Sequence, residues 1–332
     1  MAHLDDEHAA FERPRRRTQP RTKVRPDYSE AELAHVVTID RGRYTVVLDQ
    51  GGRTLTAVKA RGLGRKGVVV GDIARVVGDT SGDEGTLARI VEVQERSTVL
   101  RRSADDDDPI ERIIVANADQ LMVVAALADP PPRLGLIDRC LVAAFDAGMT
   151  PLVCLTKADL ASPDDILAQL EPLDVRVLVT QQGADTATVR DALDGHVTVL
   201  VGHSGVGKST LVNALVPDAD RSTSHVNAVT GRGRHTSTSA ISLSLPPSGP
   251  RIGGRIIDTP GIRSFGLNHV EPDHVIRAFP DLGQIAQDCP RGCPHTTDEP
   301  ECALDIAVGD GRLPAVRVIG FRRMLASRDQ RD

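Results

Sequence analysis

The chain has 332 residues, of which 40% are hydrophobic and 26% are charged, and its formal net charge is -6. The hydrophobic fraction excludes wholesale disorder, and the length predicts roughly two or three domains. Aromatic residues make up only 2% of the chain, with no Trp, which argues against recognition of nucleic acid through aromatic stacking platforms. The net negative charge excludes a uniformly basic surface, although basic residues are concentrated locally.

The hydropathy pattern indicates neither a membrane span nor a secretory leader. The longest uninterrupted apolar stretch, Leu121 to Ala128, is far shorter than the ~18 residues that a spanning helix needs. The N-terminus opens with acidic residues and has no basic segment followed by an apolar one. We therefore expect a cytoplasmic protein without a membrane partner.

The first 100 residues divide into a tail and a small β domain. Residues 1–33, with seven Arg and Lys between Arg13 and Arg25, predict a disordered basic tail that either solubilises the protein or neutralises phosphates. Residues 34–100 contain short β-rich runs separated by turns, which predicts a barrel or sandwich of about five strands. Between Asp40 and Lys66 there are seven basic and two acidic residues, an excess typical of an RNA contact or, equally, of a solvated face.

A linker and an alternating α/β segment follow. Residues 101–112, with the acidic run Asp105 to Asp108, predict a solvated linker. Residues 113–270 then alternate between β-type and helical patterns, which predicts a parallel sheet covered by helices on both faces. We expect strands at 119–127, 151–155, 175–180, 196–202 and 254–258, and helices at 136–146, 164–173 and 209–216.

One segment matches the pattern of a phosphate-binding loop. The sequence GHSGVGKS fits G-x-x-x-x-G-K-[ST] and stands between an expected strand and an expected helix, where the mechanism requires it. Its backbone N–H groups can surround phosphates, while Lys208 reaches the β- and γ-phosphate oxygens and the Ser209 hydroxyl coordinates Mg²⁺. The predicted nucleotide-binding residues here are Gly202, His203, Ser204, Gly205, Val206, Gly207, Lys208, Ser209 and Thr210.

Two shorter motifs bear on the choice of nucleotide. The sequence D-T-P-G is typical of an ordinary turn after a strand, but so soon after a phosphate loop it favours a Mg²⁺ contact by Asp258 and a γ-phosphate contact by the Gly261 N–H. A second motif, Thr156-Lys157-Ala158-Asp159, resembles the N/T-K-x-D signature of GTPases, in which the Asp carboxylate accepts two guanine N–H groups. Adenine has no such pair of donors, so Asp159 favours GTP over ATP.

The guanine motif precedes the phosphate loop, whereas in ordinary GTPases it follows D-x-x-G. A circular permutation accounts for this order, because the carboxyl ends of parallel strands meet at one edge of a sheet whatever the order of the chain. The permuted chain continues from D-T-P-G directly into a C-terminal domain, which a nucleotide-dependent switch would then move.

The C-terminal region, residues 271–332, contains a set of residues typical of metal ligands. Three thiols and one imidazole within fourteen residues predict one structural zinc ion, with unpaired or redox-active cysteines as the alternative. The other cysteines, Cys140 and Cys154, stand alone in apolar stretches, as is typical of a reduced compartment. The predicted zinc ligands are Cys289, Cys293, His295 and Cys302.

A basic helix is predicted near the end of the chain, over residues 313–327. Its arginines, Arg317, Arg322 and Arg323, are expected either to form a solvated face or to contact RNA.

In this order the motifs resemble the circularly permuted, ribosome small-subunit-dependent GTPase A family, also called RsgA or YjeQ. The resemblance covers about residues 35–325 and includes the barrel, T-K-A-D, G-H-S-G-V-G-K-S-T, G-R-G-R-H-T-S-T, D-T-P-G and the Cys/His cluster. It implies a multi-domain α/β protein, with an OB-fold domain over 34–100, a permuted P-loop GTPase domain over 113–270 and a zinc-binding domain over 271–332. It also implies GTP hydrolysis stimulated by the 30S subunit during its late maturation. The implied partners are the 30S subunit with its 16S rRNA and GTP or GDP, and we expect a monomer.

Three features depart from the family pattern. Thr156 stands where the family commonly has Asn, which leaves Asp159 to select the base. After the next strand, Thr180-Gln-Gln-Gly183 replaces the expected S-A or S-S type segment, so the loop behind the guanine stays unassigned. Two spacings within the Cys/His cluster differ by one residue each.

The residues that complete hydrolysis are less clearly marked. Ras-type GTPases carry a water-orienting Gln directly after D-x-x-G, and this position is Ile262 here, which predicts slow intrinsic hydrolysis. His235, in the segment GRGRHTST, is our candidate to orient the water, with Thr236 or Ser237 as the switch hydroxyl on Mg²⁺. Alternatively, the basic residues of this segment solvate a loop or contact rRNA phosphates. The candidate catalytic residues are His235, Lys208, Thr236 and Ser237.

Two other functions fit parts of the pattern: a P-loop ATPase or kinase, against which Asp159 argues, and an rRNA-binding assembly scaffold whose nucleotide only tunes affinity. The predicted barrel contains a single aromatic residue, Tyr44. Any RNA would therefore be bound through Arg and Lys contacts to its backbone and shape.

Overall fold

The computed structural model describes residues 27–64, 67–103, 111–217, 240–260, 267, 270–297, 299 and 301–329. The chain separates into residues 1–30 and 31–332, and every element below belongs to the second unit. Most of the predicted basic tail lies outside the described residues. So do Arg65, Lys66, His235, Thr236, Ser237, Gly261 and Ile262.

Five strands close into a barrel, as predicted. They are Glu32–Asp40 (β1), Arg43–Leu48 (β2), Thr54–Lys59 (β3), Ile73–Gly78 (β4) and Ala88–Val93 (β5). The order β1-β2-β3-β5-β4 returns to β1 through the β1–β4 pairing, which is the strand order of an OB-fold. Alternating apolar side chains such as Val36, Val46 and Ile90 fill its core. Tyr44 is buried in the same core, so this barrel offers no aromatic side chain for base stacking.

A short antiparallel pair follows the barrel. It consists of Val99–Ser103 (β6) and Glu111–Ala116 (β7). These strands extend into both ends of the segment predicted as a linker over 101–112. They were not predicted because charged residues interrupt their β-branched residues and hide the strand pattern. The N–H of Ala116 donates to the carbonyl of Val70 at 3.0 Å, which joins this pair to the loop before β4.

A six-stranded part of the sheet carries the motifs. Its parallel strands are, in spatial order, Arg176–Val179 (β10), Thr150–Thr156 (β9), Gln120–Ala126 (β8), Val197–Val201 (β11) and Gly254–Asp258 (β13). The sixth strand, Ile241–Leu245 (β12), was not predicted and runs antiparallel to β13. The connection between the two is too short for the crossover that a parallel pair needs, so the sheet is mixed rather than wholly parallel.

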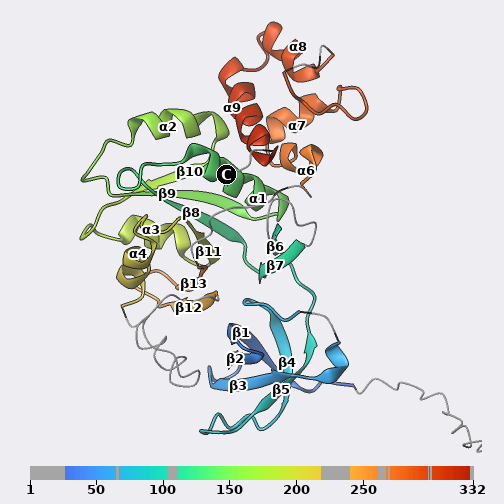
Figure 1. Ribbon diagram of the computed structural model, residues 1–332, viewed down its shortest axis with the longest axis vertical. Helices are drawn as coiled ribbons and strands as arrows, with labels where there is room; N and C mark the ends of the chain where they lie inside the picture. Colours follow the sequence, from blue (N-terminus) through green and yellow to red (C-terminus); the bar gives the residue numbers. More distant parts are fainter. Residues whose placement is uncertain are drawn as a thin grey trace, which may run out of the picture. The chain divides into compact units, whose positions relative to one another are not determined.

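Helices cover both faces of this sheet, as predicted (Figure 1). Leu134–Asp146 (α1) packs on one face, where Ile137 and Leu141 meet Val123 and Val153. Ala187–Leu193 (α3) and Lys208–Leu215 (α4) pack on the other face, against a separate cluster of apolar side chains. Asp164–Leu170 (α2) and the 3-10 turn Glu171–Leu173 (η2) follow β9. Among the described helices, none has both the length and the apolar character of a membrane span.

The C-terminal region is helical. It contains Pro272–Ile276 (α6), Pro280–Ala286 (α7), Ala303–Gly309 (α8), Ala315–Ala326 (α9) and the 3-10 turn Ser327–Asp329 (η3). Three of the five Phe of the chain meet where these helices pack on α1. The ring of Phe279 lies edge-on between Phe145, with centroids 4.9 Å apart, and Phe321, with centroids 5.5 Å apart. The scarce aromatic side chains are therefore used for internal packing.

The arginines of α9 are partly buried and bind carboxylates of the same chain, so they do not form the freely solvated face that the sequence allowed, whereas the RNA contact stays a prediction. Arg317 forms a two-fold hydrogen bond with the carboxylate of Asp281, at 2.9 Å for both bonds. Arg323 binds the carboxylate of Asp138 on α1 at 2.9 and 3.0 Å. Asp138 is almost fully buried, and this burial raises its pKa although Arg323 opposes the shift. Removal of either partner would therefore leave an unpaired charge in the interior and lower the free energy of unfolding strongly.

We predict that Arg323→Ala lowers the free energy of unfolding by about 3 kcal/mol, because it strands the Asp138 carboxylate in the interior. Arg312→Ala is a matched control on the same region, since Arg312 pairs with Asp310 at 3.4 Å with both side chains at least half exposed. It should cost less than about 1 kcal/mol. Urea unfolding of both variants, followed by circular dichroism, tests this; equal losses would contradict it.

Candidate functional site

The predicted nucleotide motifs come together at one edge of the sheet. Parallel pairing sets Val201 of β11 beside Val123 of β8, and Leu200 beside Asp258 of β13. It also sets Thr156 of β9 beside Ala126 of β8. The phosphate loop, the T-K-A-D segment and the D-T-P-G segment each begin at these strand ends. Segments that are far apart in the sequence therefore share one carboxyl edge, as the permutation hypothesis requires.

The phosphate loop joins β11 to α4, and the structure explains why two of its positions are glycine. Gly207 has φ +89°, a backbone conformation that a residue with a β-carbon rarely adopts. Gly202 lies so close to β8 that a β-carbon would approach the carbonyl oxygen of Val124 to 2.5 Å. Ser204, Gly205, Ser209 and Thr210 are exposed at the surface of the loop and the first turn of α4. The loop is thus open toward a ligand and closed toward the sheet.

Lys208 is held by the D-T-P-G segment. Its side chain is buried, and its ammonium group binds the carboxylate of Asp258 and the carbonyl oxygen of Thr259, the latter at 2.6 Å. Thr259 is fixed in turn, because its hydroxyl donates to the carbonyl of Leu200 at 2.7 Å. The two residues predicted to act on phosphate and metal therefore neutralise each other in this structure.

Thr156 connects the base motif to the phosphate loop. Its buried hydroxyl donates to the carbonyl of Val206 at 2.5 Å and lies 3.4 Å from the carbonyl of Ala125. Its side chain also lies against Gly207, where an added β-carbon would sit 3.5 Å from the Thr156 hydroxyl. The residue that departs from the family's Asn thus ties β9, β8 and the phosphate loop together.

The rest of the T-K-A-D segment forms a turn at the surface. Lys157, with φ +58°, binds the carbonyl oxygen of Asp129 through its ammonium group. Asp159 is exposed, and within the described part of the chain no hydrogen bond or ion pair engages its carboxylate. The N–H of Ala158 donates to the carbonyl of Thr180 at 3.2 Å, which places the Thr180–Gly183 segment beside this turn. That adjacency was not visible in the sequence, where the segment stayed unassigned.

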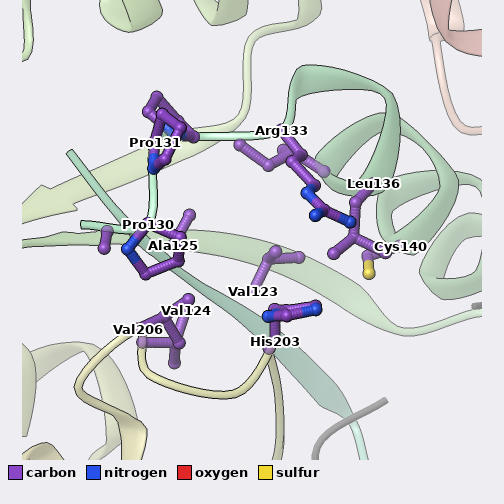
Figure 2. A pocket seen from close by; sticks show the side chains of 14 residues that line it. Val123, Val124, Ala125, Pro130, Pro131, Arg133, Leu136, Cys140, His203 and Val206 are labelled. Atoms are coloured by element: carbon purple, nitrogen blue, oxygen red, sulfur yellow. The ribbon is translucent and has the colours of Figure 1, made fainter. Parts of the chain in front are cut away.

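A small apolar pocket lies behind the phosphate loop (Figure 2). It is lined by Val123 and Ala125 of β8, by prolines 130–132, and by Leu136 and Cys140 of α1. The side chain of His203 lies at the base of this pocket rather than in the open loop, and its ring Nδ1 is 3.0 Å from the carbonyl of Ser204.

The predicted metal ligands are also assembled. The ligand atoms of Cys289, Cys293, His295 and Cys302 all lie within 4.8 Å of one another, and no disulfide joins the cysteines. Nδ1 of His295 is 3.6 Å from the sulfur of Cys289 and 3.9 Å from that of Cys302. Such separations fit four ligands around one tetrahedral ion with metal–ligand bonds of about 2.0–2.3 Å.

Burial favours the neutral forms of these groups when no cation is close to them. It raises the pKa of the Cys289 thiol to about 12, and it also raises the pKa of Cys293. It lowers the pKa of His295, which keeps the imidazole neutral with a lone pair available. A cation is what would favour the thiolate forms here, so the cluster has the chemistry of a metal site.

A phosphate loop, a T-K-x-D turn and a D-x-x-G segment at one sheet edge, in permuted order, define a circularly permuted GTPase. The RsgA GTPase family model matches residues 93–268. A small ribosomal subunit biogenesis GTPase RsgA of Pseudomonas aeruginosa is 38% identical over 272 residues, 78% of this chain and 77% of that protein. Its counterpart in Paraburkholderia xenovorans is 37% identical over 294 residues, 86% and 90% of the two chains. The chain belongs to the RsgA GTPase family.

Two solved structures have folds similar to that of this chain. The crystal structure of YjeQ from Thermotoga maritima covers 91% of this chain with a TM-score of 0.66 and 25% identity, and 99% of YjeQ is matched. The fold also matches that of YloQ, a circularly permuted GTPase, with a TM-score of 0.62 at 24% identity, over 91% of this chain and 96% of YloQ.

We predict that Thr156→Val weakens nucleotide binding roughly tenfold, which corresponds to about 1.4 kcal/mol. Valine has nearly the same shape but leaves the Val206 carbonyl without its hydrogen bond. Thr156→Ser keeps the hydroxyl and should bind as the wild type does. Titration with a fluorescent GDP analogue measures this, and equal affinities for the two variants would refute it.

Proposed function

We propose that this chain is a Mg²⁺-dependent GTPase that acts on the small ribosomal subunit during its late maturation and hydrolyses GTP faster in its presence. The observation that carries the proposal is the convergence of the phosphate loop, the Asp159 turn and Asp258 at one sheet edge. The named relatives, small ribosomal subunit biogenesis GTPases, support the choice of partner. The parts of the chain are the OB-fold barrel over 34–100, a linker over 101–112 whose two ends belong to β6 and β7, the GTPase domain over 113–270 and the zinc domain over 271–332.

The roles of the phosphate-site residues follow from their positions. Lys208 exchanges Asp258 for the β- and γ-phosphate oxygens, because its ammonium group already lies at the end of the phosphate loop. The exposed hydroxyl of Ser209 and the carboxylate of Asp258 are the groups that would hold Mg²⁺, which would neutralise phosphate charge during transfer. Gly261, whose N–H would bind the γ-phosphate, and His235, which would orient the water with Thr236 or Ser237 on the metal, lie outside the described residues and are assigned from the sequence alone.

Base selection is assigned to the turn after β9. Asp159 is exposed and unengaged within the described part of the chain, as an acceptor for two guanine N–H groups must be. Lys157 packs along the base, and the neighbouring Thr180–Gly183 segment forms the wall behind it. Ala158 and Thr156 position this turn through their backbone and hydroxyl bonds.

The remaining parts serve the ribosome contact. The cluster of Cys289, Cys293, His295 and Cys302 holds one zinc ion, because three thiolates and an imidazole form a closed tetrahedral set with no open position for catalysis. The barrel contacts 16S rRNA through basic side chains, among which Arg41, Arg43 and Arg61 are exposed. We further propose that the protein is a cytoplasmic monomer.

GTP turnover with and without purified small ribosomal subunits tests the function. We expect stimulation by the subunits, no turnover in Lys208→Ala, and loss of stimulation with intact GTP binding in His235→Ala. Turnover that the subunits do not change would contradict the proposal. If a variant that binds but does not hydrolyse GTP still supports normal maturation of the small subunit, the result would favour a scaffold whose nucleotide only tunes affinity. Stimulated turnover in His235→Ala would remove the catalytic role of His235.

Asp159→Asn is predicted to shift preference from guanine toward xanthine nucleotides. The amide presents a donor where xanthine has its second carbonyl oxygen, whereas guanine has an amino group there. Competition between GDP and XDP for a fluorescent nucleotide measures the ratio of affinities, which should change by at least about tenfold, the loss of one good hydrogen bond. No change, or tight binding of ADP, would favour a P-loop ATPase or kinase instead.

A further inference from the structure

Arg322 of α9 binds three different parts of the zinc domain with one guanidinium group. Two of its nitrogens hold the carboxylate of Asp305 on α8, both at 2.7 Å. Its Nε donates to the carbonyl oxygen of His295 at 2.7 Å. Its Nη2 lies 3.7 Å from the sulfur of Cys302. A side chain that the sequence assigned to a solvated face or to RNA thus contacts two of the four metal ligands.

The bond to His295 supports a strained residue. His295 has φ +59°, the left-handed conformation that residues with a β-carbon rarely adopt. This conformation turns the buried imidazole toward the sulfurs of Cys289 and Cys302. Since the Arg322 Nε donates to the His295 carbonyl, it stabilises the backbone in this conformation, in which the imidazole faces the two sulfurs.

The contact with Cys302 also has an electrostatic effect. Three thiolates and a neutral imidazole around Zn²⁺ carry an excess negative charge. Within the described part of the chain, Arg322 is the arginine whose guanidinium group is hydrogen-bonded to a ligand sulfur. Hydrogen bonds to ligating sulfur and fixed outer contacts to ligating residues strengthen metal retention.

The position of Arg322 is set in advance by its helix. On α9, Arg317 is bound to Asp281 and Arg323 to Asp138, so the helix is fixed from both sides of Arg322. Asp305 then fixes the guanidinium plane. The arrangement needs little reorganisation when the metal binds.

We propose that Arg322 is a positioning residue of the metal cluster, which holds His295 in its ligating conformation and neutralises the Cys302 thiolate so that the zinc ion is retained. The inference rests on the zinc occupancy proposed above.

The test measures zinc transfer from the full-length protein to a chromogenic chelator, after metal analysis of the wild type. Arg322→Ala and Arg322→Lys should release zinc about 10–100-fold faster than the wild type. Lysine keeps the charge but cannot bond Asp305, His295 and Cys302 together, so it should not rescue retention. Arg312→Ala, which removes an exposed arginine in the turn before α9, is the matched control and should release zinc at the wild-type rate.

A spectroscopic readout separates this role from simple helix packing. In the cobalt-substituted protein, Arg322→Lys should shift the sulfur-to-cobalt charge-transfer band, because it removes a donor from a ligating sulfur, and Arg312→Ala should not. Zinc release by Arg322→Lys within twofold of the control, with an unshifted band, would overturn the inference. If Arg322→Ala does not fold, Arg322→Lys and Asp305→Asn decide the outcome. A wild type without bound zinc would overturn the metal assignment itself, and with it the role of Arg322.

Discussion

The parallel pairing of β8, β9, β11 and β13 is the constraint on which the site depends. Four strands that run in one direction deliver their carboxyl ends to one edge, and the chain order of the segments that follow them then becomes irrelevant. Thr156 shows how tight this convergence is, since one hydroxyl group reaches the phosphate loop some fifty residues later in the chain. The permuted order leaves the site unchanged but alters which segment follows it in the chain, since β13 is followed by the C-terminal helices.

The attachment of those helices uses most of the few phenylalanines of the sequence and the arginines of α9. Phe145, Phe279 and Phe321 meet in one aromatic cluster, and Arg317 lies over the ring of Phe279 with 5.1 Å between its guanidinium carbon and the ring centre. Around this cluster the arginines of α9 bind carboxylates from α1, α7 and α8. The Cys/His cluster is therefore supported by a layer of helices that are joined by ion pairs and ring contacts, and not by its own four residues alone.

Much of the fold and site follows from the sequence because the signals are local. Apolar runs mark the buried parallel strands, glycines and Lys208 mark the phosphate loop, and the close spacing of Cys and His marks the metal cluster. Antiparallel β12 was missed although the alternation in ISLSL is typical of a strand, because the segment is short and directly follows a run of polar residues that hides it. The charged ends of β6 and β7 concealed their strand pattern in the same way.

Contacts between distant segments left no such signal. Arg317, Arg322 and Arg323 appear in the sequence as a basic helix, and nothing local reveals that Asp281, Asp305 and Asp138 will face them. The same holds for Thr180–Gly183, whose place beside the base motif depends on the pairing of β10 with β9. Each of the three arginines is paired with a carboxylate from a different helix, and this pairing becomes evident only once the helices have packed together.

The contact between Lys208 and Asp258 gives the nucleotide site an internal counter-ion. The positive charge of Lys208, to which we assign phosphate, and the negative charge of Asp258, to which we assign the metal, pair with each other at the end of the phosphate loop. A bare nucleotide that takes the lysine would strand a carboxylate, and a bare cation that takes the carboxylate would strand an ammonium group, each at an energetic cost. With the roles proposed above for these two residues, a metal–nucleotide complex would satisfy both partners at once, so the pair would favour the joint binding of metal and nucleotide.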